Sequence, residues 1–587
     1  MRIARPHLKW ENGAAHPFMH TPSLDLKINK IDVAFMASAA SVLFLATVLV
    51  SGKRPLWYDE IYSWTLITDP SFRHMMYALW MAAESPPGLY HVLARMWLAV
   101  TGPSTLALRL FSTFAGVVAI VAIWTTLRRA FSLRATALGV LTVFCTSAMM
   151  LLHSAEARFY PLFVACVALA IAAYARAIEA RELNWRLGAA LFFSHLALVQ
   201  AHIYGIAYSA ALLFALICCD IAMRRVRPLV YACMAGAWLS LLPWLPTLHR
   251  VNEQTKPRHW IVPPTLSGVV EFYRLYSTEL PLVLFSVAIL GVFARALSPA
   301  PTGAVRRWNL LLLLGLAGAA ILDWKNFLLL ETALLALVIV LAARGFPQLH
   351  RAPDRLRGAL LMAAAVLVAA PPAAGIFSWL VRPVFVPKYV LPSMLGMAIL
   401  LAWMVENVSR VPLAKHGATC IGIGWAILLI ALLITPLLSA LREDSHQAPR
   451  YGIRNTDVEA LVPGGIPIAV ENFHLFLPLQ QAAPPTGRSY FYVGDLEAAS
   501  VAAADPSALL HYRGSRLWRS LGYLPAGAPE WQDFLARYPV FAVVHSPGHF
   551  WFEWRIRDNP DYTWRSLGKL GRHEVVLVER KNSVPSK

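Results

Sequence analysis

The chain has 587 residues, of which 58% are hydrophobic and 14% charged, and its formal net charge is +19. Its apolar residues form runs of membrane-spanning length, which excludes an ordinary soluble globular protein. The excess of Lys and Arg does not indicate nucleic-acid binding, because these residues fill short connections between apolar runs. All six cysteines lie within or beside such runs, so neither a disulfide framework nor a Cys-ligated zinc site is supported.

The apolar runs predict an all-α polytopic membrane bundle over residues 32–438, preceded by a polar leader over 1–31. We interpret the first run as a retained span and not as a cleaved signal. About thirteen runs approach the ~20 residues that cross the hydrocarbon core. They lie near 33–51, 104–127, 135–152, 160–178, 187–201, 204–222, 229–247, 281–297, 308–323, 327–343, 358–378, 390–405 and 417–438.

Basic residues concentrate in alternate connections, on the same side as the leader. Among them are Arg128, Arg129, Arg134, Arg176, Arg181, Arg186, Arg224, Arg225, Arg227, Arg344, Arg351, Arg410 and Lys415. The positive-inside rule makes this the cytoplasmic side of an inner membrane. An odd number of spans then places the C-terminal segment outside.

The first external loop, 52–103, carries two helical repeats of apolar residues. One includes Phe72, Met75 and Leu79, and the other includes Leu89, Leu93 and Trp97. Two amphipathic helices lying in the membrane interface would explain this periodicity. The alternative is a pair of loop helices packed on the bundle.

The C-terminal segment, 439–587, alternates short β-rich runs with helical patterns. The predicted strands are 466–470, 490–493, 540–544 and 575–578, with a helix over 531–538. This alternation predicts a small extracytoplasmic α/β domain. No Gly-rich nucleotide loop occurs in it, so we expect a role in acceptor binding or stability.

Asp59 and Glu60 are the strongest chemical signal, because paired carboxylates at a membrane surface are expensive without a purpose. A partly desolvated Asp59 suits a general base in sugar transfer, with Glu60 in support. The structural alternative is Asp59 as the N-cap of a helix that starts near Ile61.

Two further polar groups lie on the same side. Glu84 and His91 flank a turn at two prolines, and Glu156 and Arg158 occupy a short external loop. Arg158 is a natural partner for a phosphate or for a carboxylate such as Asp59. Alternatively, it reaches lipid headgroups with Glu156 as its companion.

Five short motifs, taken in order, resemble the GT-C glycosyltransferases, namely the dolichyl-phosphate-mannose protein mannosyltransferases and the lipid A aminoarabinose transferases. They are Asp59-Glu60, Pro86-Pro87-Gly88-Leu89-Tyr90, Ala107-Leu108-Arg109-Leu110-Phe111-Ser112, Glu156-Ala157-Arg158-Phe159-Tyr160 and Pro387-Lys388-Tyr389-Val390-Leu391-Pro392. This chain has Lys388 where many relatives carry Arg. The resemblance implies a lipid-phosphate sugar donor and an external site where Asp59 is the base or orients the acceptor.

The leaving lipid phosphate would then require fixed cations. External candidates are Arg158, Lys256, Arg258, Arg382 and Lys388, of which Lys256 and Arg258 alternatively belong to a solvated loop. Tyr90, Tyr160 and Tyr389 lie in the matched motifs and are expected to contact substrate, and His202 would line the same site or simply pack. A divalent metal stays open, because no ligand spacing among Asp59, Glu60, Glu84 and His91 requires one.

The sequence therefore predicts an inverting transfer of one sugar from a polyprenyl phosphate to an envelope lipid, glycan or protein. A rival enzyme would use a lipid-diphosphate oligosaccharide as a polymerase or ligase. A transporter or flippase would need polar or Gly/Pro-broken spans and an internal repeat, whereas the polar residues here gather at one rim.

Overall fold

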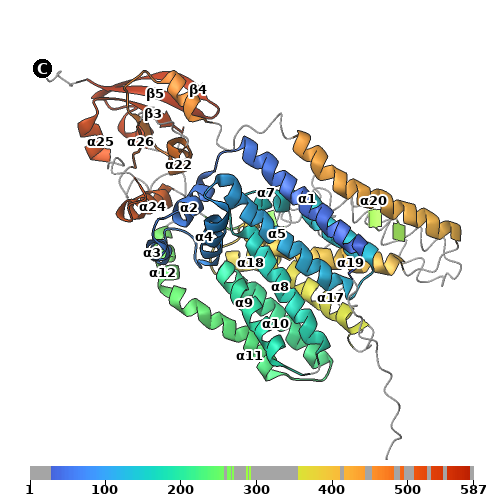
Figure 1. Ribbon diagram of the computed structural model, residues 1–587. Coiled ribbons are helices and arrows are strands. Elements are labelled where there is room, and N and C mark those ends of the chain that lie inside the picture. The colour runs from blue at the N-terminus through green and yellow to red at the C-terminus, as the bar shows by residue number, and fades with distance from the viewer. Residues whose placement is uncertain are drawn as a thin grey trace, which may run out of the picture.

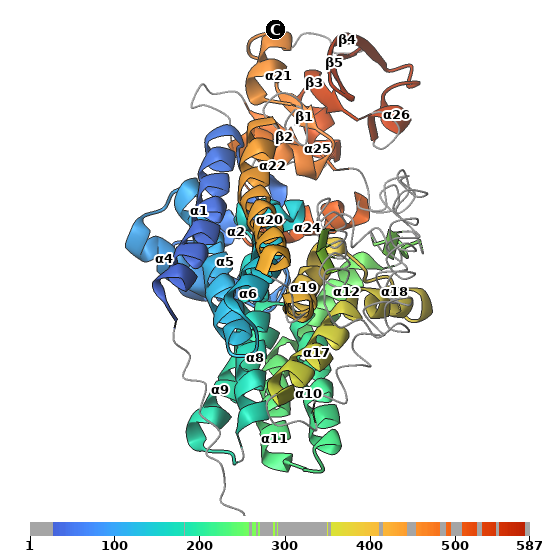
Figure 2. The same ribbon diagram turned by 90° about the vertical axis from the view of Figure 1, so that its right-hand side faces the viewer.

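The computed structural model describes residues 28–180, 182–256, 261–265, 268–269, 286–287, 290–291, 349, 354–409, 415–442, 453–481, 489–494, 508–524, 531–546 and 551–581. A helical bundle forms the larger part, and a small α/β domain lies at one end of it, opposite α11 (Figures 1 and 2). The predicted spans 281–297, 308–323 and 327–343 lie outside the described residues, apart from a few isolated positions.

The bundle is built from helices that cover each predicted span in the described ranges. They are α1 (Lys30–Lys53), α5 (Thr105–Arg128), α6 (Leu133–Leu141), α7 (Ala148–Ser154), α8 (Tyr160–Glu179), α9 (Trp185–Ala201), α10 (Gly205–Ala222), α11 (Pro228–Gly236), η2 (Ala237–Trp244), α12 (Leu245–Thr255), α17 (Arg355–Val368), α18 (Ala370–Leu380), η5 (Pro387–Ser393), α19 (Met394–Ser409) and α20 (Lys415–Arg442).

The count of thirteen spans is not confirmed. Within the described residues, seven helices are long and apolar enough to cross a membrane, and 133–146 and 417–432 form shorter apolar helices. The predicted span 135–152 is interrupted, because a π-helical turn over Thr142–Thr146 ends at Ser147, whose side chain caps α7. The chain is nonetheless a multi-pass membrane protein.

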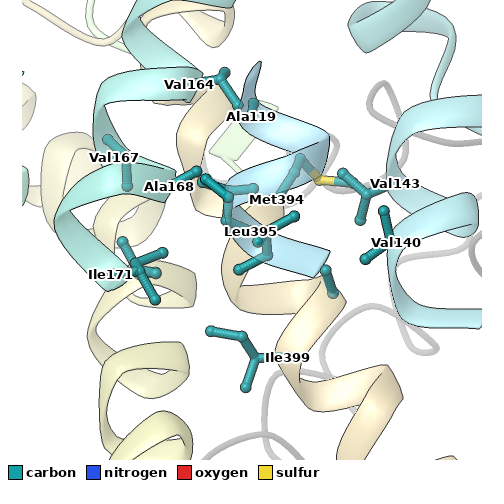
Figure 3. Packing of buried hydrophobic residues seen from close by; sticks show 14 of the residues in the cluster. Ala119, Val140, Val143, Val164, Val167, Ala168, Ile171, Met394, Leu395 and Ile399 are labelled. Atoms are coloured by element: carbon teal, nitrogen blue, oxygen red, sulfur yellow. The ribbon is translucent and has the colours of Figure 1, made fainter. Parts of the chain in front are cut away.

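The bundle core lies where α5, α6, α8 and α19 meet. Figure 3 shows Ala119, Val140, Val164 and Leu395 packed together from these four helices. The backbones approach closely at Gly139, where an added Cβ would lie 2.4 Å from the carbonyl oxygen of Ala398. Small residues permit such approach between membrane helices, so Gly139 sets the spacing of α6 and α19.

The loop over 52–103, which the sequence predicts to be external, forms three helices, α2 (Tyr58–Ile67), α3 (Phe72–Trp80) and α4 (Leu89–Thr101). The two predicted amphipathic helices are therefore confirmed as helices. Their surroundings favour the packing alternative, because the apolar stripe of α3, with Met75 and Leu79, is buried in a cluster shared with the C-terminal domain. That cluster removes Met75 and Leu79 from contact with lipid, whereas Phe72 at the start of the stripe is 51% exposed.

The C-terminal domain contains a five-stranded sheet in the order β2-β1-β3-β5-β4. The strands are β1 (Ile468–Val470), β2 (Tyr490–Tyr492), β3 (Val540–His545), β4 (Tyr562–Leu570) and β5 (His573–Arg580), and the helices are α21 (Asn455–Leu461), α22 (Phe473–Gln481), α24 (Ala508–Ser520), α25 (Trp531–Arg537) and α26 (Trp551–Arg555). Strands β2, β1 and β3 run parallel to one another, whereas β5 runs antiparallel to both of its neighbours, β3 and β4. The predicted α/β domain is present, with α22 and α24 on the side of the bundle (Figure 1).

Candidate active site

Helix α2 begins at Tyr58, two residues earlier than it would with Asp59 as its N-cap. Trp57 is the N-cap residue, and its backbone N–H donates to Oε2 of Glu60 at 3.1 Å. Glu60 therefore closes the first turn, where the helix dipole favours acidic side chains. The Asp59 carboxylate is left for other partners.

Successive residues of a helix point about 100° apart, so Tyr58, Asp59 and Glu60 face three different neighbours. Tyr58 faces the C-terminal domain, Asp59 faces the start of η5, and Glu60 faces α5. One short helix thereby joins three parts of the fold.

Asp59 pairs with Lys388, whose Nζ lies 2.9 Å from Oδ2 although the two residues are 329 positions apart in sequence. Burial alone would raise the pKa of Asp59. The charges of Lys388 and Arg158 and a hydrogen bond from the Tyr58 side chain outweigh it and hold this pKa below its usual value. Asp59 is therefore ionised at neutral pH.

Arg158 is 4% exposed and pairs with the Glu84 carboxylate. Its Nη1 also donates to the backbone oxygen of Asp59 at 2.8 Å and to Ser63 Oγ at 2.7 Å. Glu84 is further held by His91 Nε2 at 2.6 Å. Burial would raise the pKa of Glu84, but Arg158 and His91 hold it below its usual value. Glu84 and Arg158 thus form a charged pair that contacts the backbone of Asp59 through Arg158.

Glu60 is fully buried, and both of its carboxylate oxygens face Arg109. Arg109 Nε lies 2.8 Å from Oε1 and Nη2 lies 2.7 Å from Oε2, which is a bidentate pair. The backbone N–H of Ala157 also donates to Oε1 at 2.7 Å. These contacts turn the Glu60 carboxylate towards α5 and away from Lys388, and its predicted support of Asp59 stays a prediction.

An aromatic group surrounds Lys388. Its Nζ lies 5.3 Å from the ring centroids of both Trp57 and Tyr160, and Tyr389 contacts His202 at 4.7 Å between ring centroids. The Tyr160 hydroxyl is buried without a hydrogen-bond partner among the described residues. Aromatic faces of this kind suit both a cation and the apolar face of a sugar.

His202 is a neutral hydrogen-bond donor. Its Nδ1 accepts from the backbone N–H of Tyr204 at 3.2 Å, so the ring hydrogen lies on Nε2. Burial and the nearby charges of Arg158 and Lys388 lower the pKa of His202 to about 3. His202 therefore adds no charge to the site.

The remaining predicted residues make other contacts. The Glu156 carboxylate pairs with His153 at 2.7 Å, whereas the Arg158 guanidinium pairs with Glu84. Lys256 is 55% exposed and pairs with Glu253, which favours its solvated-loop alternative. Arg382 donates to Thr255 at 3.4 Å, at the end of α12. Arg258 lies outside the described residues. Tyr90 is buried beside His91, at 5.5 Å between ring centroids.

Three contributors were missed by sequence reasoning. Arg109 was visible only as part of a motif, Ser63 as an ordinary helix residue, and His474 as a residue of a remote domain. His474 of α22 stacks on Tyr58 with ring centroids 3.5 Å apart. The spacing of Asp59 and Ser63 by one helical turn was the one available signal. No group of three or more His, Cys, Asp or Glu among the described residues is arranged to hold a metal ion.

Comparison with known proteins gives one family match. Residues 84–246 match the family described as dolichyl-phosphate-mannose-protein mannosyltransferase. This segment includes Glu84, His91, Arg158 and His202, whereas Asp59 and Lys388 lie outside it. No curated protein sequence matches the chain.

Several solved structures are similar to the chain at low sequence identity. ArnT from Cupriavidus metallidurans bound to undecaprenyl phosphate is 15% identical over 94% of this chain and 98% of its own, with a TM-score of 0.41. Its apo form is 14% identical over 93% and 97%, with a TM-score of 0.43. The oligosaccharyltransferase AglB from Archaeoglobus fulgidus, solved with an inhibitory peptide and a dolichol-phosphate, is 11% identical over 88% of this chain and 69% of its own, with a TM-score of 0.38. The family match over residues 84–246 confirms, for that segment, the predicted resemblance to the mannosyltransferase branch of the GT-C glycosyltransferases.

Proposed function

We propose that this protein is a membrane glycosyltransferase that moves one sugar, a hexose or a pentose, from a polyprenyl-phosphate donor to an envelope acceptor. The acceptor is a lipid, a glycan or a protein, and the reaction takes place on the extracytoplasmic face of the inner membrane. The family match over residues 84–246 supports the donor class, because the family name specifies a lipid-phosphate sugar.

One observation carries the proposal. Asp59, Glu84, Arg158 and Lys388 come from four separate segments and meet in one buried cluster at the end of the bundle beside the C-terminal domain. Removing two acids and two bases from water costs free energy, which pairing of the charges reduces. Such buried charges are typical of functional sites. Sugar transfer from a phosphate requires a base for the acceptor and positive charge for the leaving phosphate. A carboxylate flanked by cations provides both.

In the proposed reaction the acceptor nucleophile attacks the anomeric carbon and the bond from that carbon to the phosphate oxygen breaks. Asp59 takes the proton from the nucleophile, and the electron pair leaves with the lipid phosphate. Negative charge grows on the phosphate, where Lys388 offsets it. A single displacement of this kind inverts the configuration at the anomeric carbon.

Both cations are already paired with acids, so the donor phosphate has to share them. A phosphate beside Lys388 would weaken the hold of that ammonium group on Asp59. The pKa of Asp59 would then rise towards the range in which a carboxylate is an effective base. Donor binding would in this way prepare the base for the acceptor.

The test is a transfer assay with a panel of radiolabelled polyprenyl-phosphate hexoses and pentoses and the purified full chain. We expect Asp59→Asn to lower turnover by about 10²-fold or more, since a positioned base contributes about 10² to 10⁴. The matched control is Asp69→Asn in the same loop, whose carboxylate pairs with His74 and Tyr523 instead. Undiminished turnover in Asp59→Asn would reject the proposal.

The proposed face of the membrane has its own test. In a cysteine-free background, a cysteine at the exposed position Ser520 should react with an impermeant maleimide in intact cells. A cysteine at the exposed position Val226, beside the basic residues Arg225 and Arg227, should react only after the membrane is opened. The reverse pattern would place Asp59 in the cytoplasm and exclude the proposed face.

A further inference from the structure

A buried acid–base cluster lies in the C-terminal domain, outside the candidate site. Glu471 follows β1 and His545 ends β3, and these parallel strands pair in a register that joins Val470 to Val544. The next residue of each strand is therefore Glu471 beside His545. Because side chains alternate along a strand, His545 continues the face that carries Val543. This face is opposite to the one that packs on α2 and α3.

His545 lies between two carboxylates that come from different elements. Its Nδ1 is 2.7 Å from Oε2 of Glu471, and its Nε2 is 2.9 Å from Oε1 of Glu553 on α26. The His545 side chain is 3% exposed, that of Glu471 is fully buried, and that of Glu553 is 18% exposed. Both ring nitrogens of a buried imidazole are therefore within hydrogen-bond distance of a carboxylate oxygen.

This geometry requires one extra proton. A neutral imidazole carries a single N–H group, and an ionised carboxylate can only accept hydrogen bonds. Two contacts between His545 and carboxylates at these distances therefore need either an imidazolium or a protonated carboxyl group. If the extra proton is lost, one ring nitrogen turns a lone pair towards a carboxylate oxygen, and that contact becomes repulsive.

Glu471 is the fixed side of the cluster. The backbone N–H groups of Phe552 and Ser546 donate to its carboxylate at 2.7 and 3.3 Å. Glu553 is partly exposed and has a second partner in Arg557, four residues further along the chain. Loss of the extra proton should therefore leave the N–H group on Nδ1, facing Glu471, and open the contact between Nε2 and Glu553.

We propose that His545 and Glu553 form a pH-sensitive clasp that holds α26 on the C-terminal sheet. The clasp is closed while the extra proton is bound, and it opens as the pH rises. Because Glu471 keeps its backbone hydrogen bonds, the start of α26 and the connection from β1 to α22 stay in place. Opening releases the end of α26, on the face of the domain opposite the bundle.

The groups around His545 set the direction of the change. Burial would lower the pKa of His545, but the hydrogen bonds and charges of Glu471 and Glu553 outweigh it and raise this pKa above its ordinary value of 6.5. Burial also raises the pKa of Glu471, so the proton is retained in either position. A raised histidine pKa stabilises the fold below pH 6.5, and this contribution is lost as the pH rises through the raised value.

Other titratable groups lie close to the clasp. They are Arg557 and Asp558 after α26, and Glu574, His573 and Arg572 at the start of β5, where Glu574 pairs with His545 in the strand register. Burial and the charges of Arg572 and His545 lower the pKa of His573 to about 4. A transition above neutral pH is therefore separated from the titration of His573.

Hydrogen–deuterium exchange of the full chain in lipid nanodiscs tests the clasp. The reporters are the amides of Ile556 and Arg557, which donate to the backbone oxygen of Phe552 at the end of α26. Rates between about pH 6 and 9 are corrected for the intrinsic pH dependence of exchange. We expect protection of these amides to fall by about tenfold or more, since one pKa unit of coupling corresponds to a factor of ten. The amides of Leu521 and Tyr523 at the end of α24 are internal references and should keep their protection.

Variants separate the clasp from other titrations. Glu553→Gln keeps the size of the side chain, and its amide can accept from Nε2 or donate to it, so no extra proton is needed and protection should stay constant with pH. His545→Gln removes the titrating ring and should also give constant protection. The matched control is His573→Gln, since His573 is a buried histidine of the same domain, bonded to Ser546 Oγ at 2.8 Å. This control should keep the pH dependence of the wild type.

Protection at Ile556 and Arg557 that does not change with pH in the wild type would overturn the inference. A fall of the wild-type size in Glu553→Gln, or the loss of the fall in His573→Gln, would also reject it, because the titrating group would then lie elsewhere. An equal fall at the α24 references would mean that the whole domain loosens, and not α26. If His545→Gln does not fold, Glu553→Gln decides alone. The measurement needs no substrate, so its result is independent of the sugar transfer proposed above.

Discussion

Lys388 Nζ lies 2.9 Å from Asp59 Oδ2 and joins the start of η5 to the first turn of α2. The pair is mostly buried, with 20% of the Lys388 side chain and 13% of the Asp59 side chain exposed. A partly desolvated ion pair of this kind fixes the protonation state of the carboxylate. It also places the cation where a leaving phosphate would need it.

Replacing Lys388 should change the pH profile of the proposed transfer. Activity requires ionised Asp59, so it is lost as the pH falls through the pKa of that carboxyl group. Lys388 lowers this pKa, and Lys388→Met should therefore move the acidic limb of kcat/KM to higher pH. We also expect kcat/KM to fall by about 10²-fold, since charge on the leaving group is no longer offset.

Lys388→Arg is the matched control for this prediction. It keeps the positive charge, so the acidic limb should stay near that of the wild type even if the longer side chain alters turnover. A Lys388→Met profile that superimposes on the wild-type profile would show that the pair does not control Asp59.

The Glu60 and Arg109 pair should act on stability. Removing one partner of a buried ion pair leaves an uncompensated charge and costs about 3 to 5 kcal/mol. We expect this loss in Arg109→Met, measured by thermal unfolding of the purified protein in lipid nanodiscs. Each single change leaves the charge of the other residue buried without a partner. The double change Glu60→Gln with Arg109→Met removes both charges, so it should cost less than the sum of the two single changes. Additive losses would show that the two side chains do not interact.

Gly139 offers a test of the bundle. A Cβ at this position would lie 2.4 Å from the backbone oxygen of Ala398, so Gly139→Ala must push α6 and α19 apart. We expect a loss of about 1 to 3 kcal/mol in the same unfolding assay. Gly116→Ala is the control, since its Cβ would meet the flexible end of the Leu43 side chain at 3.1 Å. Its helix-propensity gain of about 0.5 to 1 kcal/mol should offset that contact. Equal effects of the two changes would contradict the assigned close approach.

The parts of the site that the sequence predicted share one property. Asp59, Glu84, Arg158 and Lys388 all follow or precede apolar runs, so the order of the runs and the positive-inside rule place them at one end of the bundle. Which acid pairs with which base depends on side-chain geometry between segments distant in sequence. The sequence therefore did not indicate that Glu60 faces Arg109, or that Arg158 pairs with Glu84 in preference to Asp59.

The docking of the C-terminal domain was equally hidden. The apolar stripe of α3, with Met75 and Leu79, has the same pattern whether it packs against lipid or protein. The strand β4 was missed because Trp564, Arg565 and Ser566 are exposed at the sheet edge and show no apolar alternation. Periodicity indicates which face of a helix is buried. What that face packs against follows only from the tertiary fold.

A last prediction concerns the contact that ties the domain to the first loop. The Tyr523 hydroxyl donates to Asp69 Oδ2 at 2.6 Å, and Asp69 also pairs with His74. Burial would raise the pKa of Asp69, but the hydrogen bonds from Tyr523 and Ser71 and the pairing with His74 hold it below its ordinary value of 3.8. A lowered pKa stabilises the fold above pH 3.8, and this contribution is lost as the pH falls through the lowered value.

Tyr523→Phe should therefore reduce stability by about 1.5 kcal/mol at neutral pH, the lower end for a hydrogen bond to a charged group. The difference from the wild type should shrink as the pH falls below about 4, where Asp69 becomes protonated. Thermal unfolding followed by tryptophan fluorescence between pH 3 and 7 measures both effects. Tyr538→Phe is the control, because Tyr538 packs against Phe534 in a separate cluster of the same domain. A difference that stays constant with pH would mean that the Tyr523 hydroxyl does not act through the Asp69 charge.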